Sequence, residues 1–315
     1  MNRILVIRGG AIGDFVLTLP AIKLLRGAWP HARLEVVGYK HIIALAENRG
    51  YADATRSIEY GSLASFFAKD ADLPTELIDY FGSFDLIVSY LFDPDGVFEA
   101  NLRRCGAMRI VVGPAKLGAH EHAALQLARP LEGLGLSTAA VSGKLVPNQT
   151  DHAAAAELLP RHARRLIAVH PGSGSATKNW PIANWIALGR QLLGTGDAML
   201  VLIGGEADEA EIAHLRTAWA SLPVSYILNQ PLTVVAAVLE HCETFIGHDS
   251  GISHIAAAVG TRCVLLFGPT DPAVWAPIGS NVQVLRAATG LLSDITVGQV
   301  FDTVSGTPRP LLLSS

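Results

Sequence analysis

The segment GHDSGISH, residues 247–254, has the composition of a helix start that binds an anion. It lies between a short apolar run and an alanine-rich stretch, so Asp249, Ser250 and Gly251 fall where a strand gives way to a helix. The first amides of a helix have no intrahelical acceptor and lie at the positive end of its dipole, which suits a phosphate or diphosphate. Gly251 has no side chain where a ligand would approach the backbone. An ordinary Asp or Ser N-cap explains the same residues without a ligand, but it gives His254 no particular role.

Two further loops in the second half of the chain carry groups that would complete such a site. The loop HPGSGSATKNWP places Ser173 and Gly174 among small residues that can close on an anion, with Lys178 as a mobile positive charge beside them. The segment LIGGE ends in Glu206, whose carboxylate can accept hydrogen bonds from both hydroxyls of a ribose. A surface loop with a solvated lysine, and an acidic helix cap, are the alternatives that the local sequences leave open.

In the first half, the segment GGAIGD follows the first apolar run and ends in Asp14. It is not a P-loop, because no Gly-Lys-Ser/Thr closes it, and it lacks the GxGxxG spacing of dinucleotide-binding loops. The loop residues Gly10, Ala11 and Gly13 instead place a carboxylate at the start of a helix, where Asp14 can serve as the general base toward an acceptor hydroxyl. A helix N-cap without further function is the alternative.

Other kinds of chemistry find little support in the residue types. The sequence has no DxD or HExxH motif and no His/Cys cluster, so we expect no metal site. Ser250 and Ser253 do not lie in a GxSxG elbow. The net charge of −4 and the pI near 6.2 argue against a nucleic-acid partner, which requires a basic face.

The chain also lacks the signs of export or membrane insertion. No apolar stretch reaches the ~20 residues that span a bilayer, and the apolar run near the N-terminus is too short for a signal peptide. The three cysteines are far apart and fit a reducing compartment. We therefore expect a cytoplasmic protein, with peripheral contact to the cytoplasmic face of the inner membrane left open.

Strands, glycine-containing loops and helices alternate along the chain, which predicts parallel sheets with crossover helices. The rhythm lapses at residues 137–151, which we interpret as a linker. The fold class is therefore α/β, with two Rossmann-like domains at residues 1–150 and 151–315 whose sheets face an interdomain cleft. Pro20 predicts a kink or a short first helix, and a last helix at residues 296–304 is expected to pack back on the first domain.

The motifs taken together resemble those of the heptosyltransferases, glycosyltransferase family 9. The resemblance rests on motifs that follow one another along most of the chain: ILVIR, GAIGD and LPA near the N-terminus, then HPGS, KNWP, IGGE, GHDSGISHIAAA and LFGPT. It implies a GT-B fold with an N-terminal acceptor-binding and a C-terminal donor-binding domain. It also implies inverting transfer of a heptose or related sugar from an ADP-sugar to a lipopolysaccharide-core or other glycan acceptor, with no catalytic metal and no cofactor.

The resemblance assigns a role to each candidate residue. Asp14 matches the catalytic base, Lys178 the lysine that neutralises the donor diphosphate, and Glu206 the glutamate that binds the ribose. The remaining positions on the donor-binding loops are Ser173, Gly174, Asp249, Ser250, Gly251 and His254. The sequence departs from the family where Ser250 replaces the usual threonine, and in residues 63–80. Basic acceptor contacts are expected in that segment, but it contains only one lysine and is acidic overall.

Two functions of other classes stay open on the sequence alone. A nucleotide-sugar epimerase with a GT-B-like fold would act on the donor without an acceptor and would need further acid and base groups. A non-catalytic nucleotide-sugar-binding protein would have no need of both Asp14 and Lys178.

Overall fold

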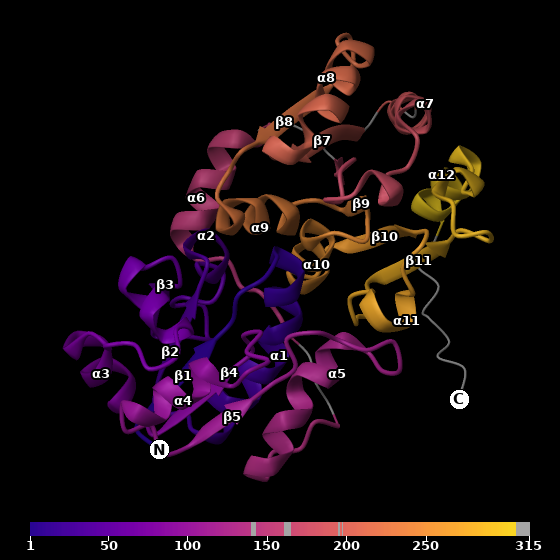
Figure 1. The fold of residues 1–315 in the computed structure, drawn as a ribbon. Coiled ribbons are helices and arrows are strands. Elements are labelled where there is room, and N and C mark those ends of the chain that lie inside the picture. The colour runs from indigo at the N-terminus through magenta and orange to yellow at the C-terminus, as the bar shows by residue number, and fades with distance from the viewer. Residues whose placement is uncertain (140–142, 161–164, 195, 197, 307–315) are drawn as a thin grey trace. The chain divides into compact units, whose positions relative to one another are not determined.

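A computed structural model describes residues 1–139, 143–160, 165–194, 196 and 198–306 (Figure 1). The chain forms two compact units, Met1–Gly143 and Lys144–Ser315. The expected boundary at residue 150 therefore lies inside helix α6, Gln149–Leu158, which belongs to the second unit. Residues 140–142 of the predicted linker lie outside the described residues.

The first unit is built on a five-stranded parallel sheet with the strand order β3-β2-β1-β4-β5. The central strand β1 has four consecutive apolar residues without solvent exposure, which is typical of a parallel strand covered on both faces. The strands are β1 Arg3–Ile7, β2 Arg33–Gly38, β3 Ala54–Ser57, β4 Leu86–Ser89 and β5 Ile110–Val112. The helical elements are α1 Ile12–Ala28, α2 Lys40–Ile43, η1 Gly61–Phe67, α3 Thr75–Gly82, α4 Val97–Arg104, α5 Ala123–Ala128 and η2 Arg129–Leu134.

Two groups of helices cover the sheet of the first unit (Figure 1). Helix α1 packs against α5, whereas η1, α3 and α4 surround an aromatic cluster of Phe66, Phe81 and Phe98 that lies against β1. Helix α1 does not end at Pro20 but continues through it to Ala28. Pro20 lacks the amide that would bond to the carbonyl four residues earlier. Burial of Pro20 and the surrounding apolar residues stabilises the helix despite that loss.

The second unit is built on a six-stranded parallel sheet with the order β11-β10-β9-β6-β7-β8. Its strands are β6 Arg165–Val169, β7 Ala198–Gly204, β8 Val224–Leu228, β9 Thr244–His248, β10 Arg262–Phe267 and β11 Val282–Arg286. Its other helical elements are η3 Ala176–Lys178, α7 Ile182–Leu193, η4 Glu206–Asp208, α8 Glu209–Ala218, α9 Leu232–Glu240, α10 Gly251–Ala258, α11 Pro272–Trp275, η5 Leu292–Asp294 and α12 Val297–Ser305.

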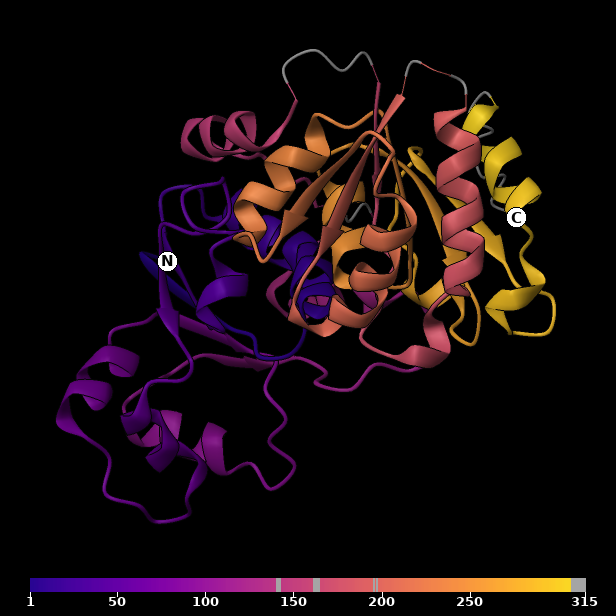
Figure 2. The same cartoon turned by 90° about the horizontal axis from the view of Figure 1, so that it is seen from above.

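Helices lie on both faces of this second sheet (Figure 2). One face is covered by α7, α8 and α12, whose apolar residues form a single cluster with the strands. The other is covered by α9 and α10, which contact each other. Among the described helices, none is long and apolar enough to cross a membrane.

The last helix, α12, forms where the sequence predicts it. Val300 and Val304 of α12 are buried in the core of the second unit, and α12 contacts α7 and β10. The guanidinium of Arg262, in β10, donates hydrogen bonds to the carbonyls of Thr303 and Val304 at 2.6 and 2.7 Å. These contacts show that the apolar stripe of α12 packs within its own unit.

Candidate functional site

Three loops predicted to bind one ligand follow three neighbouring strands of the second sheet. Strands β9, β6 and β7 are adjacent and parallel, so their carboxyl ends lie at the same edge. In open α/β sheets, ligands bind at this edge. The edge loops are defined as residues 170–181 after β6, residues 204–208 from the last residue of β7 onward, and residues 248–250 from the last residue of β9 onward.

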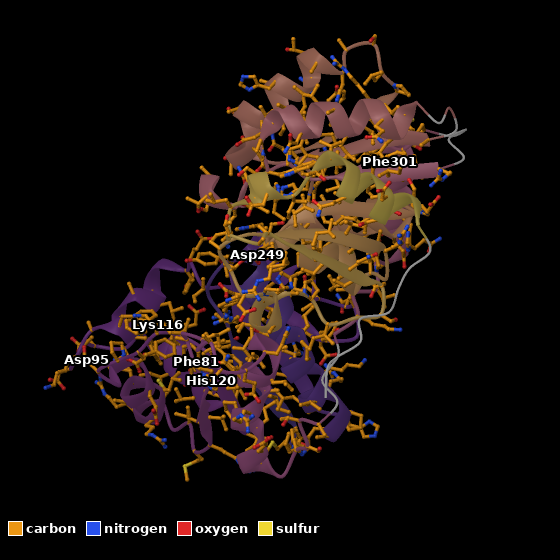
Figure 3. The ribbon with its side chains drawn as sticks, turned by 90° about the vertical axis from the view of Figure 1, so that its right-hand side faces the viewer. Phe81, Asp95, Lys116, His120, Asp249 and Phe301 are labelled. Atoms are coloured by element: carbon orange, nitrogen blue, oxygen red, sulfur yellow. The ribbon has the colours of Figure 1, made fainter. Side chains whose placement is uncertain are left out.

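An ion pair joins two of the edge loops. The ammonium of Lys178 donates a hydrogen bond of 2.9 Å to Oδ2 of Asp249, across 71 residues of sequence. The side chain of Lys178 is 29% exposed and that of Asp249, seen in Figure 3, is 11% exposed. The structure thus brings together the two oppositely charged residues of the predicted site, and it leaves the lysine accessible to a ligand.

Beside this pair, helix α10 begins as the sequence predicts. Ser250 is its N-cap, with extended backbone, and its hydroxyl accepts a hydrogen bond from the amide of Ser253 at 3.4 Å. Gly251 is the first helical residue and is half-buried, whereas His254 is buried one turn on. The cap satisfies one of the helix's initial amides and leaves the first ones without an intrahelical acceptor. The N-cap and the anion-binding interpretations of this segment are therefore compatible.

The residues predicted in the other two edge loops, unlike Lys178 and Asp249, make no hydrogen bond or ion pair with another edge loop within the part of the chain that the structure describes. The hydroxyl of Ser173 lies 2.9 Å from the carbonyl oxygen of Ser175 and 2.6 Å from Oδ1 of Asn179, so it closes its own loop. Gly174 has a φ of +71°, a left-handed conformation that favours glycine. Glu206 begins η4 with an exposed side chain, and it makes no hydrogen bond or ion pair with the rest of the described chain.

A buried carboxylate that the sequence analysis did not single out joins the loops after β6 and β7. Asp208 accepts a hydrogen bond from the amide of Gly205 at 2.8 Å, and its Oδ2 lies 3.3 Å from Nε2 of His170. Burial alone would raise the pKa of Asp208, but the contacts with His170 and Gly205 leave that pKa below its usual value. A Cβ on Gly172 would lie 1.6 Å from Oδ1 of Asp208, so only glycine fits there.

A second buried group, His248, contacts both ends of the loop 170–181. Its Nε2 accepts a hydrogen bond from the amide of Trp180 at 2.9 Å, and its Nδ1 lies 3.4 Å from the carbonyl oxygen of Gly172. The ring has no solvent exposure. The sequence did place His248 directly before Asp249, but nothing in the local pattern distinguished it from any other strand residue.

In the first unit, Asp14 lies in the first turn of α1. The amide of Ala11 donates to its Oδ2 at 3.0 Å, and Nη2 of Arg8 lies 3.4 Å from its Oδ1. The Asp14 side chain is 35% exposed, whereas that of Arg8 is 4% exposed. Gly10 has a φ of +99°, and a Cβ there would lie 2.8 Å from Oδ2 of Asp14. The loop of Gly10 and Ala11 therefore wraps the carboxylate and leaves part of it open.

Arg8, also in the first unit, was not among the residues predicted from the sequence. Besides Asp14, its guanidinium donates a hydrogen bond to the carbonyl of Tyr90 at 3.4 Å. Burial lowers the pKa of Arg8, while the neighbouring carboxylate opposes that shift. A buried cation is costly without a partner, so Arg8 and Asp14 fix each other's position.

Across the described residues, no group of three or more His, Cys, Asp or Glu side chains could hold a metal ion.

The model of glycosyltransferase family 9 (heptosyltransferase) matches residues 120–303. The chain belongs to this family. It is 24% identical over 306 residues to lipopolysaccharide heptosyltransferase 3 of Escherichia coli, a match that covers 86% of this chain and 84% of that protein. It is 32% identical over 136 residues to lipopolysaccharide heptosyltransferase 2 of Escherichia coli K12, covering 40% of this chain and 38% of that protein. This second match thus spans less than half the length of the relative.

A solved structure shows the same fold. The structure of E. coli ADP-heptose lps heptosyltransferase II covers 96% of this chain and 97% of its own, with a TM-score of 0.78 and 18% sequence identity. At this identity the likeness concerns the fold alone, and it confirms the predicted GT-B class with two Rossmann-like parts. The family-9 resemblance drawn from the motifs is confirmed as well.

Proposed function

We propose that this family-9 protein is an inverting glycosyltransferase that moves a heptose or related sugar from an ADP-sugar to a lipopolysaccharide-core or other glycan acceptor. The observation that carries the proposal is the position of Lys178 and Asp249 beside the start of α10, at the carboxyl edge of the second sheet. Helix amides and one accessible ammonium are groups that stabilise a departing diphosphate without a metal. ADP as the nucleotide is supported by the similar fold of E. coli ADP-heptose lps heptosyltransferase II.

In the proposed reaction, Asp14 accepts the proton of the acceptor hydroxyl while that oxygen forms a bond to the anomeric carbon. The bond from this carbon to the diphosphate oxygen breaks, and ADP leaves with the electron pair. The attack comes from the side opposite the leaving group, so the configuration at the anomeric carbon inverts. Lys178 and the first amides of α10 receive the negative charge, while Glu206, which has no other partner among the described residues, is free to accept the ribose hydroxyls.

The loop of Gly10 and Ala11 supports Asp14 in this role. A general base has to be both accessible and fixed in orientation. Asp14 meets both conditions, because one of its oxygens accepts the amide of Ala11, the buried Arg8 holds the other, and a third of the side chain is exposed. Since the proposed acceptor is a lipopolysaccharide intermediate, we also propose that the protein works on the cytoplasmic side, in peripheral contact with the inner membrane.

The decisive experiment compares the wild type with Asp14→Asn. We expect the wild type to release ADP from ADP-heptose only when a heptose-deficient lipopolysaccharide core is present. Asp14→Asn is expected to bind ADP normally and to lose transfer by a factor of at least about 100, as removal of a general base does. Near-normal transfer by the variant would exclude the role of Asp14.

The same assay separates the other candidate functions, and a thermal-shift panel tests the donor. A new isomer of the sugar nucleotide formed without acceptor would identify an epimerase. Binding without any turnover would identify a non-catalytic protein. Stabilisation by ADP-sugars but not by GDP-, UDP- or dTDP-sugars would support the proposed nucleotide, and the reverse selectivity would contradict it.

A further inference from the structure

His248 is a buried titratable residue that contacts both ends of the loop 170–181, yet it has no part in the proposed reaction. Its two ring nitrogens contact two backbone groups that are eight residues apart, the carbonyl of Gly172 and the amide of Trp180. Between those groups lies the part of the loop that carries Ser173, Gly174 and Lys178. The imidazole therefore bridges the two ends of this loop.

The hydrogen bonds define one tautomer of the ring. The amide of Trp180 can only donate, so Nε2 carries a lone pair, and the proton lies on Nδ1, which donates to the carbonyl of Gly172. A protonated imidazole would direct a second N–H at the Trp180 amide. Burial is the main reason why the pKa of His248 falls to about 3, so the ring stays neutral at physiological pH.

The surroundings of the ring hold it in place. The ring of Trp185 packs edge-on against His248 with 5.5 Å between centroids, and Trp180 packs in the same way against Trp185 at 5.3 Å. The indole of Trp180 donates to the carbonyl of Ile295 at 2.9 Å, which anchors this end of the loop to the core. The carbonyl of His248 itself accepts a hydrogen bond from the hydroxyl of Ser253, in α10.

The other end of the loop is fixed at Gly172. This glycine contacts His248 through its carbonyl, and its Cα lies against the buried carboxylate of Asp208. Asp208 in turn holds the amide of Gly205, directly before Glu206. The three edge loops therefore meet on two buried side chains, Asp208 and His248.

We propose that His248 is a positioning residue of the donor site, whose neutral ring holds the loop 170–181 closed so that Lys178 faces Asp249 and the start of α10. This inference rests on the proposed function, which supplies the ligand. The contacts of His248 with the loop do not depend on that function. His248 touches neither the donor nor the acceptor in this scheme. It acts through Lys178, and its loss is expected to weaken diphosphate binding rather than to remove an acid or a base.

The test uses two variants of His248 and one control on the same strand. His248→Phe keeps an aromatic ring against Trp185 but removes both hydrogen bonds. His248→Gln can restore the acceptor for the Trp180 amide. Thr244→Val is the control, because the buried hydroxyl of Thr244 has no hydrogen-bond partner among the residues that the structure describes.

We expect His248→Phe to lower the affinity for ADP by about 5- to 30-fold, since it leaves a buried amide unpaired. His248→Gln is expected to recover most of this loss, and Thr244→Val to bind ADP like the wild type. In a double-variant cycle, Lys178→Met is expected to lose less ADP affinity in the His248→Phe background than in the wild type. Both changes act on ADP binding through the same group, the Lys178 ammonium. Wild-type ADP affinity in His248→Phe, additive losses, or a failure of Gln to recover any affinity would each overturn the proposal.

Two readouts separate positioning from catalysis and from a failure of the proposed function. The pH dependence of transfer by His248→Gln is expected to match that of the wild type, whereas loss of one limb would make His248 an acid or base and overturn the proposal. Hydrogen exchange of residues 171–180 in the ligand-free protein is expected to accelerate in His248→Phe and not in Thr244→Val. Unchanged exchange would refute the loop-holding role. If the wild type binds no ADP, the proposed function fails, and hydrogen exchange still decides the role of His248.

Discussion

Replacing Lys178 by methionine is expected to weaken the binding of ADP by about 10- to 30-fold. A hydrogen bond to a charged group contributes roughly 1.5–3 kcal/mol, which corresponds to roughly 10- to 150-fold in affinity. The lysine side chain is 29% exposed, so water screens its charge and the lower part of that range applies. Methionine keeps the length of the aliphatic chain, so the loss reports on the ammonium and not on packing.

The partner of this lysine is expected to behave in the opposite way. Asp249 lies 2.9 Å from the ammonium in the ligand-free protein, where it competes with a diphosphate for Lys178. At that distance two unit charges interact by about 1.4 kcal/mol in a water-like dielectric. Asp249→Asn is therefore expected to leave ADP affinity unchanged or to raise it by up to about 10-fold. Transfer of the sugar is expected to fall if the Asp249 carboxylate also binds the donor.

Isothermal titration with ADP at two ionic strengths checks both expectations. The loss in Lys178→Met is expected to shrink at high salt, because screening weakens the ammonium–phosphate attraction in the wild type. Lys23→Met, which removes an exposed lysine of α1, is the charge-matched control, and thermal unfolding verifies that each variant is folded. The reasoning is refuted if Lys178→Met binds ADP as tightly as the wild type, or if Asp249→Asn weakens ADP binding as much as Lys178→Met.

Two further predictions concern stability. The contacts with His170 and Gly205 hold the pKa of Asp208 below its unfolded value. Asp208 therefore stabilises the fold above that unfolded value, and this contribution is lost as the pH falls below about 4 and through the folded pKa. Thermal unfolding between pH 3 and 7 is expected to show a smaller acid-induced loss in Asp208→Asn; an identical pH dependence would contradict this account. Arg262→Ala removes the hydrogen bonds to the end of α12. This variant is expected to lose about 1–3 kcal/mol of unfolding free energy in urea titrations, with ADP affinity unchanged. An unchanged unfolding midpoint would contradict this prediction.

The alternation of apolar runs and glycine loops was sufficient to predict the fold class, but not every strand. Strands β3, β8 and β11 have no uninterrupted apolar run to mark them, and all three lie at a sheet edge. An edge strand has a neighbour on one side only, so it needs fewer apolar residues than a central strand. The residues of β3, ATRS, are all partly exposed and lack the β-branched apolar run that identified β1. Their strand conformation depends on pairing with β2, which the local sequence does not encode.

The candidate site could be predicted to the extent that each loop has its own local signal. Glycines and small residues after a strand mark the loops that contain Ser173, Glu206 and Asp249, and parallel topology implies that such loops share an edge. The pairing of Lys178 with Asp249 across 71 residues depends instead on the strand order β9-β6-β7, which the sequence does not specify. Arg8 and His248 were missed for the same reason, because their partners come from other segments.

The proposed catalytic base and the proposed donor loops are held by different physical means, and the difference follows from the charge of the ligand. Asp14 is an anion paired with the buried cation Arg8, and its acceptor substrate brings a neutral hydroxyl to it. In the proposed function the edge loops receive a diphosphate, and the exposed carboxylate of Glu206 is assigned to the ribose rather than to the phosphates. A fixed cation beneath these loops would retain ADP after transfer. The groups that shape the loop around Lys178 are accordingly buried: a neutral His248, a backbone amide and carbonyl, and Asp208, which is covered by Gly172 and engaged with His170. In the proposed function, Lys178 is the mobile charge at this edge, which leaves Asp249 for the phosphate and returns when ADP departs.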